Sequence, residues 1–284
     1  MEIINGKNIA SELEGEIYKE TNNMRKLGII PTLSLIVIKG DKKSELYVKR
    51  KKEACERVGI KGIIKKINNK ISTKEFILKI EEMNNDKRIN GILFQTPLPS
   101  QLNEIELSSV ISPEKDVDGL NPGSVGRTLL GERSYVSAGA IAAKTVIEKN
   151  GIKIKDANCV ILGTNNILCK PFAALMIKEE GNVIILSEES SRINELTPLA
   201  DIVLIDIEKP KFLKSNMIKK GCLIIDCGYN EINGKLIGNV DKESVKDKAK
   251  FLTPVPGGIG PILIAALMKQ VVGATQNQNN LTNK

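Results

Sequence analysis

The chain has 284 residues, 42 Lys and Arg against 34 Asp and Glu, and no histidine. The lack of histidine excludes Ser-His-Asp and Cys-His nucleophiles and every histidine metal site, so proton transfer near neutral pH must use a tuned Lys, Asp, Glu, Cys or Tyr. The net charge of +8 fits attraction of a small polyanion, whereas an aromatic content of 3% provides no stacking platform, and we expect no nucleic-acid partner.

The residue pattern leads us to expect neither a membrane anchor nor an export signal. Residues 1–7 lack a basic segment followed by an apolar one, and no apolar run approaches the roughly 20 residues that span a bilayer. Five cysteines without CxxC spacing are typical of buried, reduced thiols in a cytoplasmic protein. These cysteines are Cys55, Cys159, Cys169, Cys222 and Cys227.

The first half of the chain alternates strand and helix patterns. Short apolar runs indicate strands, and Ser72 with Glu75 forms a capping box that begins a helix. Strands are predicted at 33–38, 60–67 and 91–95, and helices at 44–58 and 72–84. This alternation predicts a parallel sheet with right-handed crossover connections.

After a loop at 112–123, the second half repeats the alternation in the manner of a dinucleotide-binding fold. Helices are predicted at 140–149 and 171–180, and strands at 159–162, 183–186, 202–207 and 222–226. We therefore predict an α/β protein of two domains with a cleft between them. The first is a three-layer domain of residues 1–138 with the C-terminal helix 262–284, and the second is a Rossmann-like domain of residues 139–261.

One helix face in the first half carries a candidate acid/base group. Ser44, Tyr47 and Lys51 lie at i, i+3 and i+7, just beyond the end of a strand, where α/β sheets bind ligands. A lysine between a tyrosine ring and an apolar wall has its pKa lowered by desolvation. The same lysine is also part of the charge run 49–52, which is typical of a solvated face. Gln95 ends a strand and is placed to bind a ligand, the lysine or loop backbone.

Two loops offer further ligand contacts. Asp116 and Asp118 lie two residues apart, and a carboxylate there can accept paired donors of an amino-heterocycle or stabilise a turn. The segment 253–261 holds three prolines and three glycines, so it is a stiff loop that leads into an apolar helix at 262–272. Composition alone leaves a ligand-binding wall and an interdomain turn equally open for this loop.

The predicted nucleotide loop is 163–171, between a strand and a helix. It is not GxGxxG, but Gly163 frees the backbone for a pyrophosphate at the helix N-terminus. Glu188 follows the next strand, where an acidic group favours ribose hydroxyls and repels a 2′-phosphate. The loop taken alone is a weak indication of nucleotide binding.

Four motifs in order give the chain a specific resemblance. They are Ser44-x-x-Tyr47-x-x-x-Lys51, Gln95-x-Pro-Leu-Pro99, Lys115-Asp-Val-Asp-Gly119 and Thr253-Pro-Val-Pro-Gly-Gly-Ile-Gly-Pro261. With them, the chain resembles the bifunctional methylenetetrahydrofolate dehydrogenase/methenyltetrahydrofolate cyclohydrolase family from about residue 3 to residue 273.

The resemblance implies a folate cleft, with Lys51 as the acid/base group, Tyr47 as the ring that packs on folate, Gln95 as the partner of the lysine and Asp118 as the pterin-binding carboxylate. Substrate contacts are implied at Ser44, Tyr47, Pro97, Leu98, Asp118, Pro256, Gly257 and Gly258. Cofactor contacts are implied at Gly163, Thr164, Asn165, Ile167, Glu188 and Tyr229.

The same resemblance implies further properties of the protein. They are NADP as cofactor with NAD as the alternative, no metal, tetrahydrofolate substrates with or without polyglutamate, and a homodimer built through the nucleotide-binding half. A cytoplasmic role in one-carbon metabolism that serves purine biosynthesis is implied as well.

This chain departs from the family pattern mainly on the nucleotide side. The departures stand at 137–140, Asn165, Cys169, Glu208, Asn239 and 262–263. Because Cys169 and Glu208 stand where the family has glycine, we expect their side chains to obstruct the cofactor and to weaken its binding, with Lys170 as a compensating cation. The alternatives are a cyclohydrolase without dehydrogenase activity and a folate-binding protein without turnover.

Overall fold

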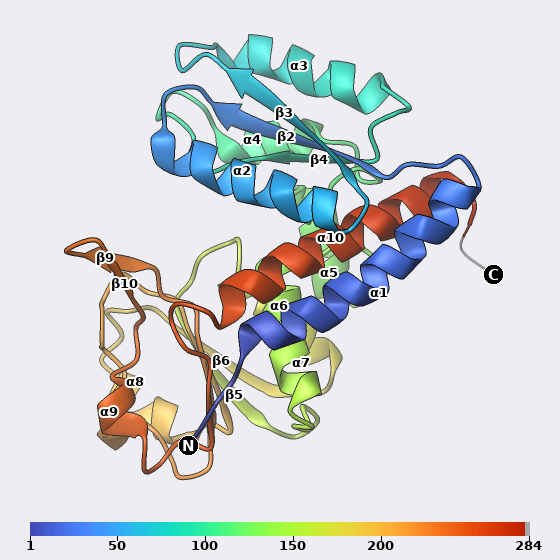
Figure 1. Ribbon diagram of the computed structural model, residues 1–284. Coiled ribbons are helices and arrows are strands. Elements are labelled where there is room, and N and C mark those ends of the chain that lie inside the picture. Colours follow the sequence, from blue (N-terminus) through green and yellow to red (C-terminus); the bar gives the residue numbers. More distant parts are fainter. Residues whose placement is uncertain (282–284) are drawn as a thin grey trace. The chain divides into compact units, whose positions relative to one another are not determined.

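The computed structural model describes residues 1–281, and the chain divides into two compact units (Figure 1). The three-stranded unit comprises residues 11–137 and 264–284, and the six-stranded unit comprises residues 1–10 and 138–263. Each unit contains a parallel sheet, as the strand-helix alternation predicts.

The sheet of the three-stranded unit has the order β3-β2-β4. The central strand β2 (Thr32–Ile38) is buried at every residue, so its sequence is a continuous apolar run rather than an alternating one. It pairs in parallel with β3 (Lys61–Ile67) and β4 (Gly91–Phe94). Helices α2 (Lys42–Arg57) and α3 (Thr73–Asn85) lie on opposite faces of this sheet (Figure 1).

Local capping fixes where the helices of this unit begin. The predicted capping box is confirmed, because the Ser72 hydroxyl accepts from the Glu75 backbone and the Glu75 carboxylate accepts from the Ser72 backbone. Asp41 caps α2, Asn103 caps α4 (Glu104–Val110) and Asn121 caps α5 (Pro122–Leu129), each through a side-chain oxygen that accepts from backbone N–H groups of the first turn.

The sheet of the six-stranded unit has the order β1-β11-β8-β7-β5-β6, with all neighbours parallel. Its strands are β1 (Glu2–Ile3), β5 (Asn158–Leu162), β6 (Asn182–Leu186), β7 (Ile202–Ile205), β8 (Leu223–Asp226) and β11 (Phe251–Leu252). Its helical segments are α6 (Ala138–Lys149), α7 (Cys169–Lys178), α8 (Ile193–Leu196), η1 (Thr197–Leu199), η2 (Ser215–Met217) and α9 (Lys242–Val245). A hairpin of β9 (Asn230–Ile232) and β10 (Lys235–Ile237) completes the unit.

The observed division differs from the predicted one at the N-terminus. Residues 1–10 belong to the six-stranded unit because β1 pairs with β11, a contact between residues about 250 positions apart. Two long helices, α1 (Gly6–Lys26) and α10 (Ile259–Gln278), each have residues in both units.

Helix α10 corrects the expectation that no apolar segment is long enough to span a bilayer. By length and composition it passes that test, and among residues 1–281 it is the one helix that does. More than half of its apolar stretch is buried inside the protein, as in a core helix. The apolar character of α10 is therefore accounted for by packing.

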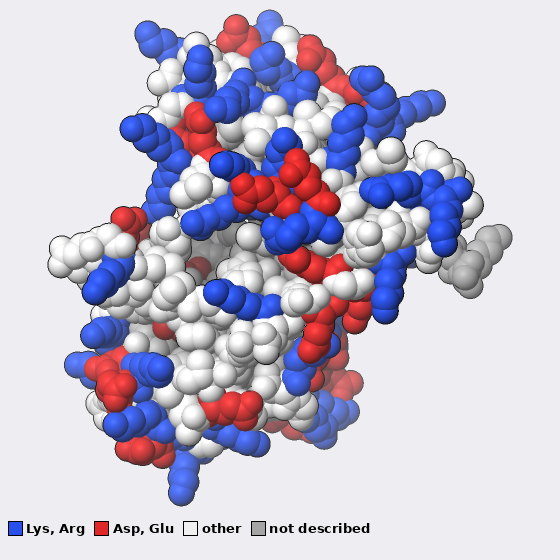
Figure 2. Space-filling view, viewed as in Figure 1, with Lys and Arg blue, Asp and Glu red and all other residues white. Residues whose placement is uncertain are grey.

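The five cysteines are free thiols, four of them buried and Cys227 partly buried. Within residues 1–281, no group of three or more Cys, Asp or Glu side chains is arranged to hold a metal ion. Figure 2 shows Lys and Arg interspersed with Asp and Glu over the face in view, and many of these charges form ion pairs on the surface.

Candidate functional site

Lys51 and Gln95 are in direct contact in the three-stranded unit. The Lys51 Nζ donates to Gln95 Oε1 at 3.1 Å, joining α2 to the residue that follows β4. The backbone of Gln95 donates to Ile36 O, and its side-chain Nε2 donates to Thr96 O at 2.8 Å. Because both ends of Gln95 are fixed, its amide oxygen faces the lysine, and the predicted contact between the two residues is confirmed.

Burial lowers the pKa of Lys51, while the negative charge of Asp118 acts in the opposite direction. A lysine in such a setting exchanges a proton near neutral pH more readily than one on the surface. Cys55 lies one turn further along α2 and is fully buried against Met268, and burial raises its pKa to about 12. The Cys55 thiol therefore stays protonated and uncharged, so it is a packing residue and not a nucleophile.

The loop that carries Asp118 is held rigidly on both sides. The buried Lys115 amine donates to the backbone carbonyls of Met83, Asn84 and Asp86 at 2.7–3.1 Å. The buried Asp116 carboxylate accepts from the backbone N–H groups that follow Asp118, at 3.0 and 3.1 Å. Of the two aspartates the sequence left open, Asp116 stabilises the turn, and Asp118 is the partly exposed one between these anchors.

Tyr47 and Ser44 differ in how they are presented on α2. Tyr47 is partly exposed one turn before Lys51, and the Arg50 guanidinium lies 6.0 Å from its ring centre. Ser44 is buried, and its hydroxyl donates to the Asp41 carboxylate at 2.6 Å. The Ser44 hydroxyl thus helps to cap α2, and its predicted contact with substrate stays a prediction.

The proline-glycine loop lies in the six-stranded unit. Gly257 has φ +98°, and its carbonyl accepts from Gly6 N at 3.1 Å. A Cβ on Gly6 would lie 1.8 Å from the Gly258 carbonyl oxygen, so glycine is required where this loop meets the start of α1. Pro256 is exposed. The prediction that Pro256, Gly257 and Gly258 share a site with Lys51, which lies in the other unit, stays a prediction.

Gly163 allows a close approach of backbones at the predicted nucleotide loop. Its φ is +129°, and a Cβ there would lie 2.4 Å from Asp206 O and 2.8 Å from Cys169 Sγ. Cys169 is fully buried, and burial raises the pKa of its thiol to about 12. The expectation that the Cys169 side chain obstructs the cofactor is therefore wrong, because the thiol packs under Gly163 instead of facing solvent.

Asn165 has a role that the sequence did not reveal. Its Oδ1 accepts from the backbone N–H groups of Leu168 and Cys169, and its Nδ2 donates to Asp206 Oδ2 at 2.8 Å. The side chain thus occupies amide groups at the start of α7, which would otherwise face an anion. Thr164 and Ile167 are exposed on the same loop.

A lysine accompanies the acidic residues after β6. Lys209 Nζ donates to Glu188 O at 3.3 Å and to Glu189 Oε1 at 2.6 Å. The exposed Glu208 donates its backbone N–H to Glu188 Oε2 at 3.4 Å. Lys170, the expected compensating cation, donates instead to Asn166 Oδ1. The cation beside the acidic pair is therefore Lys209, which the sequence analysis missed.

Tyr229 follows β8 and is exposed, beside a strongly anchored turn. The buried Asp226 carboxylate accepts from Gly228 N, Asn239 N and Val240 N at 2.9–3.0 Å. Asn239, a departure from the family pattern, donates its side-chain amide to the carbonyls of Ile207 and Lys209. Hydrogen bonds of Asp226 and Asn239 thus connect the segments that follow β7 and β8, close to the predicted cofactor residue Tyr229.

Two family profiles match the chain. The catalytic domain of tetrahydrofolate dehydrogenase/cyclohydrolase matches residues 4–118, and the NAD(P)-binding domain of the same enzymes matches residues 137–279. Together the two matches account for nearly all of the sequence.

Relatives and solved structures are similar over almost their whole length. The "Bifunctional protein FolD" of Halalkalibacterium halodurans is 35% identical over 96% of this chain and 98% of its own, and "Bifunctional protein FolD 2" of Lactobacillus johnsonii is 38% identical over 98% of each. The structure of the bifunctional FolD enzyme of Campylobacter jejuni has a TM-score of 0.96 at 30% identity, covering 98% of this chain and 99% of its own. The Trypanosoma brucei dehydrogenase-cyclohydrolase, solved with NADP cofactor and an inhibitor, has a TM-score of 0.92 at 27% identity, covering 97% of each chain.

Proposed function

Because the chain belongs to the tetrahydrofolate dehydrogenase/cyclohydrolase family, we propose that it is a bifunctional enzyme that interconverts methylene-, methenyl- and formyl-tetrahydrofolate. The observation that carries the proposal is the 3.1 Å contact between Lys51 and Gln95, beside the loop of Asp118. The bifunctional relatives favour two activities over a cyclohydrolase alone.

In the cyclohydrolase reaction, Lys51 manages the proton. Water adds to the carbon of the methenyl cation and loses a proton to the neutral Lys51 amine. One carbon–nitrogen bond then breaks as the carbonyl forms. The ammonium gives its proton to the departing ring nitrogen, and the hydroxyl proton of the adduct leaves to water, which gives formyl-tetrahydrofolate. Gln95 orients the amine, and burial lowers the pKa of Lys51, which favours the neutral form that accepts the proton.

The other named residues position the substrate. Tyr47, partly exposed beside Lys51, packs on the folate ring, and Asp118 accepts paired donors from the pterin. Pro97 and Leu98, which follow Gln95 and Thr96, form an apolar edge. The rigid frame of Lys115 and Asp116 keeps Asp118 in place, so that the reacting carbon stays within reach of Lys51.

In the dehydrogenase reaction, a nicotinamide nucleotide accepts hydride from methylene-tetrahydrofolate. The proposal places such a group in the six-stranded unit because the chain matches the NAD(P)-binding domain of the family there, with the Gly163 loop at the C-terminal end of β5. Thr164, Asn165, Ile167 and Tyr229 are our cofactor contacts. We assign NADP, with NAD as the alternative. Glu188 opposes a 2′-phosphate, but the Lys209 amine, which contacts the Glu188 carbonyl and the Glu189 carboxylate, supplies a positive charge beside it.

We assign the folate site to the three-stranded unit and the nucleotide site to the six-stranded unit, to which residues 1–10 also belong. The protein is a cytoplasmic homodimer that acts on tetrahydrofolates with or without polyglutamate and supplies one-carbon units for purine biosynthesis. Dimerisation through the six-stranded unit is supported by β6, an edge strand with Ile185 exposed, and by the exposed Ile177 and Leu199.

The absorbance of methenyl-tetrahydrofolate tests both activities of the purified protein. Its disappearance measures cyclohydrolase activity, and its formation from methylene-tetrahydrofolate with NADP or NAD measures dehydrogenase activity. We expect both reactions. Hydrolysis without hydride transfer to either nucleotide would restrict the function to the cyclohydrolase, and the absence of both would leave a folate-binding protein.

A further inference from the structure

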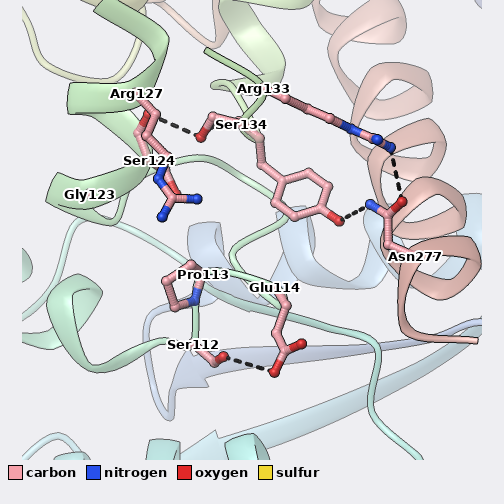
Figure 3. A pocket seen from close by; sticks show the side chains of 10 residues that line it. Ser112, Pro113, Glu114, Gly123, Ser124, Arg127, Arg133, Ser134 and Asn277 are labelled. Carbon is pink, nitrogen blue, oxygen red and sulfur yellow. Dashed lines mark hydrogen bonds between the residues drawn. The ribbon is translucent and has the colours of Figure 1, made fainter. Parts of the chain in front are cut away.

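A cavity of about 550 Å³ lies in the three-stranded unit, and none of the residues that line it is assigned to the proposed reactions. Its volume is within the range of small-molecule sites. It is lined by Ser112, Pro113, Glu114, Gly123, Ser124, Arg127, Arg133, Ser134, Tyr135 and Asn277 (Figure 3). None of these residues is a large aliphatic one, so the cavity suits a small polar ligand.

The cavity and the Lys51–Gln95 pair lie at opposite ends of β4. Gln95 directly follows the strand, whereas Asn90 directly precedes it and exchanges hydrogen bonds with Gln278 at 2.9 Å. Gln278 also donates to the carbonyl of Glu114, a residue of the cavity wall. Four residues of strand span roughly 13 Å. A ligand in the cavity therefore does not occupy the site around Lys51.

Arg127 is the cation most available to a ligand in the cavity. It is exposed near the end of α5, and Figure 3 shows its guanidinium directed into the cavity. Among residues 1–281, the structure gives its guanidinium no hydrogen bond or ion pair. A guanidinium offers up to five N–H donors in a fork that matches phosphate oxygens.

A second guanidinium is held in a fixed orientation on the same wall. Arg133 Nη2 donates to Asn277 Oδ1 at 2.9 Å, and Asn277 Nδ2 donates to the Tyr135 hydroxyl oxygen at 3.1 Å. Since that oxygen is the acceptor, the Tyr135 O–H remains able to donate. Burial also raises the pKa of Tyr135, so the hydroxyl keeps its proton at neutral pH. Two guanidinium groups and a phenol therefore stand as donors in the wall of this cavity.

Glu114 provides an acceptor away from these donors. Figure 3 shows its carboxylate turned toward the Ser112 hydroxyl, 3.5 Å away, rather than toward either arginine. A carboxylate in that position repels a second acid group but accepts hydrogen bonds from sugar hydroxyls. The wall thus has a cationic region and a separate acceptor.

We propose that this cavity binds a small phosphomonoester of a polyhydroxylated compound, with the phosphate held by Arg127 and Arg133 and the hydroxyl groups by Glu114. Two guanidinium groups match the charge of a phosphate dianion better than that of a single carboxylate. The site is independent of the proposed enzymatic function, because it uses none of the residues assigned to either reaction.

Isothermal titration calorimetry with ribose 5-phosphate, ribose and inorganic phosphate tests the proposal on the full chain. We expect ribose 5-phosphate to bind more tightly than inorganic phosphate and ribose to give no heat of binding. Arg127→Ala should weaken ribose 5-phosphate at least about tenfold, and Arg127→Lys should weaken it less, because charge remains while the fork is lost. Cyclohydrolase activity and thermal stability should stay unchanged, since Arg127 is exposed.

Arg25→Ala is the matched control, because Arg25 is also exposed in this unit and makes only a 3.5 Å contact with Gly59 O. It should bind ribose 5-phosphate like the wild type. Equal weakening in both variants would indicate general ionic attraction and overturn the proposal. Binding that is unaffected by Arg127→Ala would also overturn it, because the ligand would then lie elsewhere, such as at the nucleotide loop. The absence of binding, or equal affinity for inorganic phosphate and ribose 5-phosphate, would overturn it too.

Discussion

Lys51 on α2 donates a 3.1 Å hydrogen bond to the side chain of Gln95, the residue that directly follows β4. The pair is 44 positions apart in sequence, and the parallel register of β2 and β4 brings it together. The Lys51 amine is thus buried, has a fixed acceptor in the Gln95 oxygen, and feels the negative charge of Asp118. A group that carries a proton needs these three features.

Replacing Lys51 with Met should remove methenyl-tetrahydrofolate hydrolysis. General acid–base groups contribute roughly 10²–10⁴-fold, and the chain has no histidine to substitute for the amine. Folate binding, followed by fluorescence or calorimetry, should stay close to that of the wild type. Lys49→Met is the matched control, because Lys49 is exposed and pairs loosely with Glu53 at 3.9 Å. Hydrolysis by Lys51→Met within about tenfold of the control would contradict the assignment.

The same variant should change how stability depends on pH. Folding lowers the pKa of Lys51 below its unfolded value of about 10.4. Between the two values the unfolded chain binds more protons, so this group makes the folded wild type more stable as pH rises through that interval. Lys51→Met lacks this contribution. Urea denaturation should therefore show the wild type gaining on the variant between neutral pH and pH ~10, and a constant difference would mean that the pKa is not lowered.

Changing Gln95 to Glu should shift the pH profile of hydrolysis. A carboxylate in place of the amide stabilises the charged form of Lys51 and raises its pKa, in opposition to burial. The limb of the profile that reports Lys51 should move upward by roughly 1–3 pH units. Gln101→Glu, at an exposed glutamine that donates to Asn69 O, should leave the profile in place. Equal profiles for both variants would remove Gln95 from the role of tuning the lysine.

The buried strands could be predicted from the sequence, whereas the exposed hairpin and the pairing of β1 could not. The apolar run at 33–38 became β2 because a parallel strand covered on both faces is apolar throughout. In contrast, the hairpin of β9 and β10 is largely exposed, so no apolar pattern marks it. The pairing of β1 with β11 depends on contacts across almost the whole chain and leaves no local trace.

The candidate site shows the same limit. Lys51 and Gln95 could be found because each lies in a motif at the end of an element. The contact of Asn165 with Asp206 and the position of Lys209 beside Glu189 depend on how strand ends pack, between residues 41 and 20 positions apart. Likewise, only the structure shows that Cys169 turns inward, because a residue name does not give the direction of its side chain.

Glu188→Gln should increase the affinity for NADP and leave that for NAD nearly unchanged. The carboxylate stands after β6 where a 2′-phosphate is expected, and the nearby Lys209 forms its ion pair with Glu189 rather than with Glu188. Solvent screening limits the gain to about tenfold. Lys209→Gln should act in the opposite direction, and Glu243→Gln, at an exposed residue of α9 that pairs with Lys246, is the control. Titrations with both nucleotides measure the effect, and a parallel gain for NAD would show that the 2′-phosphate is not involved.

Asp226→Asn should destabilise the six-stranded unit and weaken nucleotide binding together. The buried carboxylate accepts three backbone N–H groups at 2.9–3.0 Å, and an amide nitrogen in place of one oxygen leaves buried donors facing each other. Such a mismatch costs about 1–3 kcal/mol. Asp241→Asn is the matched control, because Asp241 accepts one backbone N–H at the start of α9 and asparagine is also a good cap. Chemical denaturation with a nucleotide titration separates the effects. A loss in Asp226→Asn no greater than in Asp241→Asn would mean that this carboxylate does not hold the turn beside Tyr229.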